Sequence, residues 1–192
     1  MSPVKDRFRR PFPTPGTVVS AVALAWALFG IPLFHIDGDV GRHIRVGRHI
    51  LSTGRIPRTD VFSYTMFGEP FVPFEWLSEV FFAMADRIAG LTGVAVLSAL
   101  LFAATSLVVY SLVRRLGVGP LLASVTAALS MVLQAVHLLP RPHLFTTLLA
   151  AVFLLLLESY RIRRSVVALG ALIPIMVLWT NLHGGFLVGF VL

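Results

Sequence analysis

The chain has 192 residues, of which 57% are hydrophobic and only 13% are charged, and its mean hydropathy is +0.87. This balance excludes an ordinary water-soluble domain and indicates a membrane protein. The net charge of +7 does not indicate nucleic-acid binding, because several basic residues bracket apolar runs. We expect membrane lipids as the anionic partner. The absence of cysteine excludes disulfides, thiolate metal sites and a cysteine nucleophile.

The first apolar run, residues 17–35, follows a basic segment, 1–16, that contains Lys5 and three arginines. A basic start before an apolar run also describes a secretory signal peptide. A membrane span is favoured because about 18 apolar residues cross roughly 30 Å of hydrocarbon, and no small-residue cleavage site follows. We predict a cytoplasmic amino-terminal segment over 1–16 and a membrane domain over 17–192.

Later apolar runs predict further membrane spans. They cover residues 91–113, 118–138, 144–160 and 166–180, with a partial span over 186–192. The last run is too short to cross a membrane, so we expect the chain to be an amino-terminal piece of a longer protein. The predicted fold class is all-α: a polytopic transmembrane helix bundle with a long first outer loop over 36–90.

Orientation follows from the basic residues in the short loops. Arg114 and Arg115 close one turn, and a second turn on the same side as the basic amino terminus contains Arg161, Arg163 and Arg164. This side is predicted to be cytoplasmic. The long loop then lies outside, although it also contains arginines, because it is rich in acidic residues and is long enough to weaken the charge bias.

The long outer loop is expected to be folded. Residues 39–52 predict an amphipathic surface helix with Val40, Ile44, Gly47 and Leu51 on its apolar face. A second amphipathic helix is predicted over 75–89, leading into the next span. The aromatic residues of the loop are expected to pack against one another and the membrane interface; they are Phe62, Tyr64, Phe67, Phe71, Phe74 and Trp76.

Asp37 and Asp39 are the first candidate catalytic residues. They follow directly after the first span, where a carboxylate could act as a base or a cation ligand. Helix capping by Asp39 is the alternative interpretation. His43 lies four residues after Asp39, so on a helix the two would share a face and could bind one divalent metal ion. An ordinary surface histidine is the alternative there.

Arginines and glutamates of the two loop helices extend this set. Arg42, Arg45 and Arg48 could hold a phosphate by charge-assisted hydrogen bonds, or could only touch lipid headgroups. Glu75 and Glu79 lie one turn apart on the second helix and add carboxylates to the outer face.

Two further polar groups lie at outer helix ends. One is Arg141 with His143, and the other is Asn181 with His183. Ionisable groups at such depth need partners or a water-filled cavity, which makes them site candidates. We expect these residues to converge at one outer-face site with others from the long loop: Asp39, His43, Glu75, Arg141 and His183.

The order of several motifs carries a resemblance. The motifs are Asp37-Gly-Asp39, then His43, Val46-Gly-Arg-His-Ile-Leu, Gly54-Arg-Ile-Pro-Arg-Thr-Asp60-Val-Phe-Ser-Tyr-Thr, Gly68-Glu-Pro, Glu75-Trp-Leu-Ser-Glu79, Arg141-Pro-His-Leu-Phe-Thr and Trp179-Thr-Asn-Leu-His-Gly-Gly-Phe. Together they resemble a group of bacterial polytopic membrane proteins related to the GT-C glycosyltransferases. The likeness covers nearly the whole chain from Asp37 onward. One departure is Val40-Gly-Arg42, which stands where the family has aromatic residues.

The resemblance implies a multi-pass enzyme of the bacterial inner membrane that transfers a sugar from a polyprenyl-phosphate-linked donor. The acceptor, a glycan, lipid or protein, would be met on the outer face. Asp37 or Asp39 would activate this acceptor or position a divalent cation, Mg²⁺ or Mn²⁺. Arg42, Arg141 or His143 would hold the lipid phosphate.

Two other function classes remain open. A transporter or lipid flippase would place polar residues along a central pathway with broken helices at mid-membrane, whereas this sequence places them at helix ends. A non-catalytic or truncated membrane scaffold agrees with the short last span.

Overall fold

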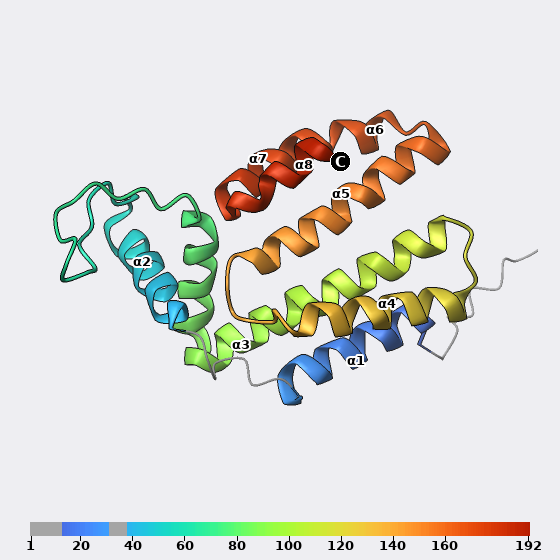
Figure 1. The fold of residues 1–192 in the computed structure, drawn as a ribbon, viewed down its shortest axis with the longest axis horizontal. Coiled ribbons are helices and arrows are strands. Elements are labelled where there is room, and N and C mark those ends of the chain that lie inside the picture. Colours follow the sequence, from blue (N-terminus) through green and yellow to red (C-terminus); the bar gives the residue numbers. More distant parts are fainter. Residues whose placement is uncertain (1–12, 31–37) are drawn as a thin grey trace, which may run out of the picture.

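The structure is a computed structural model that describes residues 13–30 and 38–192 (Figure 1). These residues form α1 (Pro15–Phe29), α2 (Asp39–Thr53), α3 (Trp76–Arg115), α4 (Pro120–Ala135), α5 (His143–Arg163), α6 (Val166–Gly170), α7 (Leu172–Leu182), the 3-10 helix η1 (Gly184–Leu187) and α8 (Val188–Val191). Within the described ranges, the β-structure is an isolated bridge between Thr59 and Pro70. The all-α prediction is therefore confirmed for this part of the chain.

Helix α3 is broken near its first third. Ala89 and Gly90 leave the helical conformation, and Gly90 has φ 60° and ψ −151°, which glycine adopts at little cost. The first part of α3, residues 76–88, packs with α2 at one end of the molecule (Figure 1). We call α2 with residues 76–88 the surface layer. The break falls where the sequence predicted a surface helix to meet a membrane span.

The rest of α3, residues 91–115, runs through a helical bundle. Helices α1, α4 and α5 pack against α3, and α7 packs against α5 (Figure 1). Small residues permit close approach of the helices; fully buried alanines are Ala23 and Ala27 of α1 and Ala123 and Ala127 of α4. A hydroxyl also links two helices, since Ser20 Oγ donates to the carbonyl of Ala103 over 3.1 Å.

In the part of the chain that the structure describes, two helices, α3 and α5, are long and apolar enough to cross a membrane. With 15 and 16 residues, α1 and α4 are shorter than the predicted spans 17–35 and 118–138. The predicted span 166–180 is divided into α6 and α7. Pro174 explains this division, because it lacks the N–H that would bond to the carbonyl of Gly170 and its ring crowds that carbonyl.

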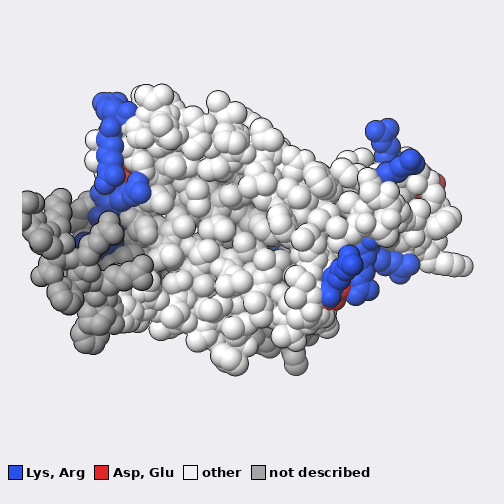
Figure 2. Space-filling view, turned by 180° about the vertical axis from the view of Figure 1, so that it is seen from behind, with Lys and Arg blue, Asp and Glu red and all other residues white. Residues whose placement is uncertain are grey.

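Charge is distributed unevenly along the molecule. On the face shown in Figure 2, Lys and Arg side chains gather towards its two ends, with largely uncharged surface between them. The sequence explains this pattern, since residues 88–113, 116–140, 142–157 and 165–192 contain no Asp, Glu, Lys or Arg. Large apolar side chains are exposed on these stretches, including Leu121, Leu133 and Ile173. An apolar surface of this kind needs an apolar partner.

Helix α2 buries its apolar face against α3, with one correction to the predicted face. Val40, Ile44 and Gly47 are buried as expected, but Leu51 is 42% exposed. The buried stripe continues to Ile50, and Leu51 is turned about 100° from it on the helix.

The segment between α2 and α3 forms a turn that presents some of its aromatic residues outward. Phe62 and Phe71 pack edge to face with ring centroids 5.7 Å apart, whereas Tyr64 is 99% exposed and Phe67 is also exposed. The carboxylate of Asp60 closes the turn by accepting the backbone N–H of Phe62 over 2.7 Å. Phe62 and Phe71 thus pack on each other as expected, and packing of the exposed Tyr64 and Phe67 against the membrane interface stays a prediction.

Candidate functional site

The surface layer meets the start of α5 and the end of α7 at one end of the bundle (Figure 1). Most of the predicted site residues lie in this region, on segments that are far apart in sequence. Asp37 lies outside the described residues.

Asp39 and Arg141 form an ion pair, with 3.1 Å between Asp39 Oδ2 and an Arg141 guanidinium nitrogen. Asp39 is the first residue of α2, and the cap position belongs to Gly38. The predicted capping position of Asp39 is therefore wrong by one residue. A carboxylate in the first turn still interacts favourably with the helix dipole. Nearby in sequence, His143 Nε2 donates to the backbone carbonyl of His137 over 2.8 Å.

Glu79 is the most deeply buried carboxylate of the surface layer, with 1% of its side chain exposed. Its Oε1 lies 3.2 Å from His43 Nδ1 and 3.6 Å from an Arg42 guanidinium nitrogen. Among the described residues, no hydrogen-bond partner reaches its buried Oε2. Arg42 and His43 thus place cationic and hydrogen-bonding groups around a carboxylate that burial would otherwise disfavour as an anion.

His183 forms another cluster with residues of three helices. Its Nε2 lies 3.4 Å from Glu75 Oε1, and its Nδ1 lies 2.8 Å from Thr146 Oγ1 and 3.0 Å from the backbone nitrogen of Gly185. Trp179 Nε1 donates to the same Thr146 oxygen over 2.8 Å.

Asn181 also ties the end of α7 to the surface layer. Trp76 Nε1 donates to Asn181 Oδ1 over 2.9 Å. Trp76 is the first residue of α3, directly after Glu75. The contact therefore fixes the start of the surface helix beside His183.

Burial shifts the pKa of two of these groups. Burial raises the pKa of Glu75, an effect that the nearby positive charges of His43 and Arg42 oppose and that Glu79 and Asp39 reinforce. Burial likewise lowers the pKa of His183, with His143 and His43 adding to the shift.

A hollow of about 440 Å³ borders this region, between α2 and the segment that follows it. It is lined by Gly41, Arg42, Arg45, Asp60, Phe62, Ser63 and Phe71. Two guanidinium groups beside aromatic rings suit an anionic ligand with an apolar or ring-shaped part.

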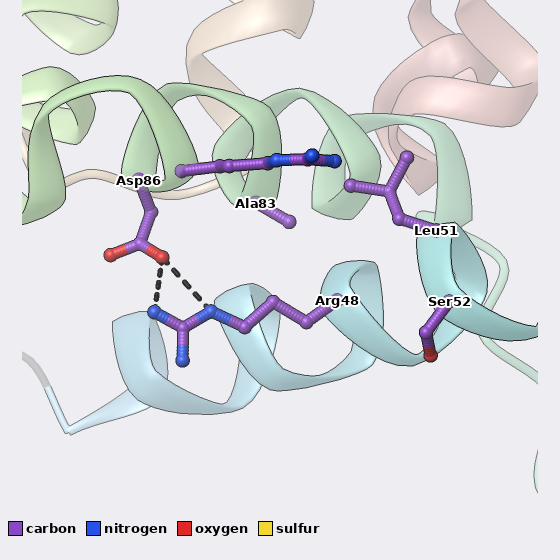
Figure 3. A pocket seen from close by; sticks show the side chains of 6 residues that line it. Arg48, Leu51, Ser52, Ala83 and Asp86 are labelled. Atoms are coloured by element: carbon purple, nitrogen blue, oxygen red, sulfur yellow. Dashed lines mark hydrogen bonds and ion pairs between the residues drawn. The ribbon is translucent and has the colours of Figure 1, made fainter.

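A second hollow, of about 340 Å³, lies between α2 and the first part of α3 (Figure 3). Arg48 extends along it to Asp86, with Nε 2.9 Å from the carboxylate and a second guanidinium nitrogen on the same oxygen. Arg48, a predicted phosphate ligand, is thus engaged with a carboxylate, and this pair joins the two helices of the surface layer.

The described residues alone do not form a complete metal site. No group of three or more His, Asp or Glu side chains gathers there with a geometry that could hold a metal ion. Asp39 pairs with Arg141, and His43 Nδ1 faces Glu79. The tentative metal pair Asp39 and His43 stays a prediction.

Sequence reasoning did not single out Thr146 and Trp179. Both lie within the motifs that carry the resemblance, and Trp179 stands four residues before His183. On a continuous helix this spacing puts two side chains on the same face. That spacing could have indicated that Trp179 lies beside His183. Thr146 is neutral, and nothing in the sequence indicated that it belongs to the site.

Comparison of the chain with protein-family models, with curated proteins and with solved structures finds no match. The function of the protein is therefore inferred from the arrangement of its residues.

Proposed function

We propose that this protein is a membrane glycosyltransferase of the GT-C type that transfers a sugar from a polyprenyl-phosphate-linked donor to an acceptor at the outer face of the inner membrane. The observation that carries the proposal is the ion pair between Asp39 and Arg141. It joins a carboxylate and a guanidinium group from distant segments at one end of the bundle. Transfer from a lipid phosphate needs both kinds of group beside the membrane surface.

The membrane arrangement is supported by the position of the charges. Four long stretches of the sequence lack charged residues, and α3 and α5 are long enough to cross a bilayer. The surface between the charged ends exposes apolar side chains. A bundle embedded as a polytopic domain would cover this surface with lipid and leave the surface layer in the headgroup region.

In the proposed reaction, a carboxylate acts on the acceptor and the cationic side chains act on the leaving phosphate. An acceptor hydroxyl loses its proton to a carboxylate while its oxygen bonds to the anomeric carbon of the sugar. The bond between that carbon and the phosphate oxygen breaks, and polyprenyl phosphate leaves with the electron pair. Arg141, with Arg42 and His143, would neutralise this phosphate. Asp37 or Asp39 would activate the acceptor or hold the cationic groups in place.

A direct transfer assay tests the function. Membranes containing the full-length gene product would be given a polyprenyl-phosphate donor with a radiolabelled sugar, and the label should move from the lipid fraction to an acceptor. Membranes without the protein are the control. Movement of intact donor between leaflets, with the label still on the lipid, would instead indicate a flippase. Neither transfer nor movement would favour a scaffold.

The topology gives a separate prediction, which uses the absence of native cysteine. A membrane-impermeant maleimide should label Tyr64→Cys in cells with an intact inner membrane, because this side chain is fully exposed and belongs to the loop that we propose lies outside. It should label Arg163→Cys only after permeabilisation. The opposite pattern would reverse the orientation, and labelling of both sites without permeabilisation would contradict the membrane arrangement.

A further inference from the structure

The hydrogen bonds around His183 determine which of its nitrogens carries the proton. The backbone N–H of Gly185 points at His183 Nδ1 over 3.0 Å. An amide N–H can only donate, so Nδ1 must accept and cannot carry a hydrogen in this arrangement. Because a neutral imidazole has one N–H, the proton lies on Nε2, the nitrogen that faces Glu75.

Thr146 reinforces this tautomer. With Nδ1 as an acceptor, the Thr146 hydroxyl must donate its hydrogen over the 2.8 Å contact. Its oxygen in turn accepts the indole N–H of Trp179, and Trp179 is completely buried. The hydrogen bonds therefore run in one direction from Trp179 through Thr146 to His183, and the remaining N–H of His183, on Nε2, lies 3.4 Å from Glu75 Oε1.

The backbone at Gly185 makes room for this chain of hydrogen bonds. A Cβ atom added there would lie 2.7 Å from side-chain atoms of Thr146 and 2.8 Å from His183 Nδ1. A larger residue would displace one of the two groups. Gly185 thus supports the contact between Thr146 and His183 in two ways: it leaves room for both side chains, and its N–H donates to His183.

We infer that Glu75 is the carboxylate that takes the acceptor's proton, and that His183 is a positioning residue that holds Glu75 by donating from Nε2. This inference rests on the proposed glycosyl transfer. The proton passes from the acceptor hydroxyl to Glu75 as the new bond to the anomeric carbon forms and polyprenyl phosphate leaves. Asp39 then has the separate role of holding Arg141 for the departing phosphate.

The other carboxylates of the region fit this role less well. Glu79 is buried against His43 and Arg42, and Asp39 forms an ion pair with Arg141. Glu75 has 16% of its side chain exposed, and its partner is a neutral imidazole N–H. Burial raises its pKa despite His43 and Arg42, and a higher pKa makes a carboxylate a better proton acceptor at neutral pH.

The test combines transfer kinetics with nitrogen NMR of the histidine rings, both on the full-length protein in lipid nanodiscs. Glu75→Gln should lower kcat by about a hundredfold and remove the fall in kcat/KM at acid pH. Glu69→Gln, an exposed carboxylate of the same loop, should behave like wild type. His183→Gln, whose amide N–H can replace Nε2–H, should retain far more activity than His183→Ala. NMR should show a hydrogen on Nε2 of His183 and none on Nδ1.

Each contrary result has one meaning. Near-normal transfer by Glu75→Gln, alongside a defective Asp39→Asn, would overturn the role of Glu75 and leave the proposed function standing. A hydrogen on Nδ1, or equal losses in His183→Gln and His183→Ala, would overturn the positioning role. Absence of transfer by the wild-type protein would overturn the proposed function and the role of Glu75 with it.

Discussion

Asp39→Asn is expected to lower sugar transfer by about a hundredfold or more, since a misplaced charge-stabilising group in a transition state typically costs this much. Asparagine preserves the size of the side chain and suits a helix start about as well as aspartate. It removes the negative charge that holds the Arg141 guanidinium at 3.1 Å. The protein should therefore fold normally and fail in catalysis. The measurement is kcat and KM with the labelled lipid-linked donor.

Variants of Arg141 distinguish the two roles that Asp39 could have, which are activating the acceptor and holding Arg141 in place. Arg141→Gln should raise the KM for the donor and lower kcat, because it removes a phosphate ligand. The exchanged pair Asp39→Arg with Arg141→Asp restores an ion pair with reversed polarity, and this variant should fold like wild type and remain inactive. The remaining variants to be assayed are Asp37→Asn and the double variant with asparagine at both positions 37 and 39. Normal turnover in both single Asn variants and in the double variant would eliminate these aspartates from the mechanism.

Gly47→Ala is expected to separate α2 from α3. A Cβ atom at Gly47 would lie 1.9 Å from the backbone carbonyl oxygen of Glu79. A backbone atom cannot rotate away as a side chain can, so the helices must move apart, at a cost of about 1–3 kcal/mol. The movement would also disturb the contact of His43 with Glu79. Hydrogen exchange should show faster exchange of the α2 amides.

Gly41→Ala provides the matched control on the same helix. A Cβ atom there would meet nothing within 4 Å. Alanine has the higher helix propensity, by about 1 kcal/mol, so this variant should be as stable as wild type or more so. Equal effects of the two substitutions would show that the close approach at Gly47 does not hold the surface layer together.

The sequence predicted the helical elements well where their physical signals are local. Gly54, with φ 65°, ends α2, and Gly90 interrupts α3 at the expected boundary. Pro174 could have predicted the division of the span 166–180. The uninterrupted apolar run around it led instead to the prediction of a single helix. The predicted end of the first span, residues 31–35, lies outside the described residues, as does Asp37.

The sequence predicted which residues belong to the candidate site, but it did not predict which of them pair with one another. Ionisable side chains at outer helix ends are unusual enough to be noticed in a sequence. Which carboxylate meets which cation depends on how α2 lies on α3. The close contact of Gly47 with the backbone of Glu79 sets the distance between these helices, and no pattern in the sequence near Gly47 predicts that contact. Pairing of Asp39 with Arg141 and of Glu75 with His183 therefore required the structure.

The break at Ala89 and Gly90 has a consequence for the height of the reactive groups above the bilayer. One helix supplies both a membrane-length segment and the part of the surface layer that begins directly after Glu75. Whereas Phe81 packs on Phe145 of α5 with ring centroids 5.7 Å apart, this layer exposes Met84 and Ile88, which form an apolar stripe with helical spacing. In the proposed membrane arrangement, this stripe would rest on the acyl chains and keep the carboxylates level with the phosphates of neighbouring lipids. A polyprenyl phosphate could then reach the site by lateral diffusion within its leaflet.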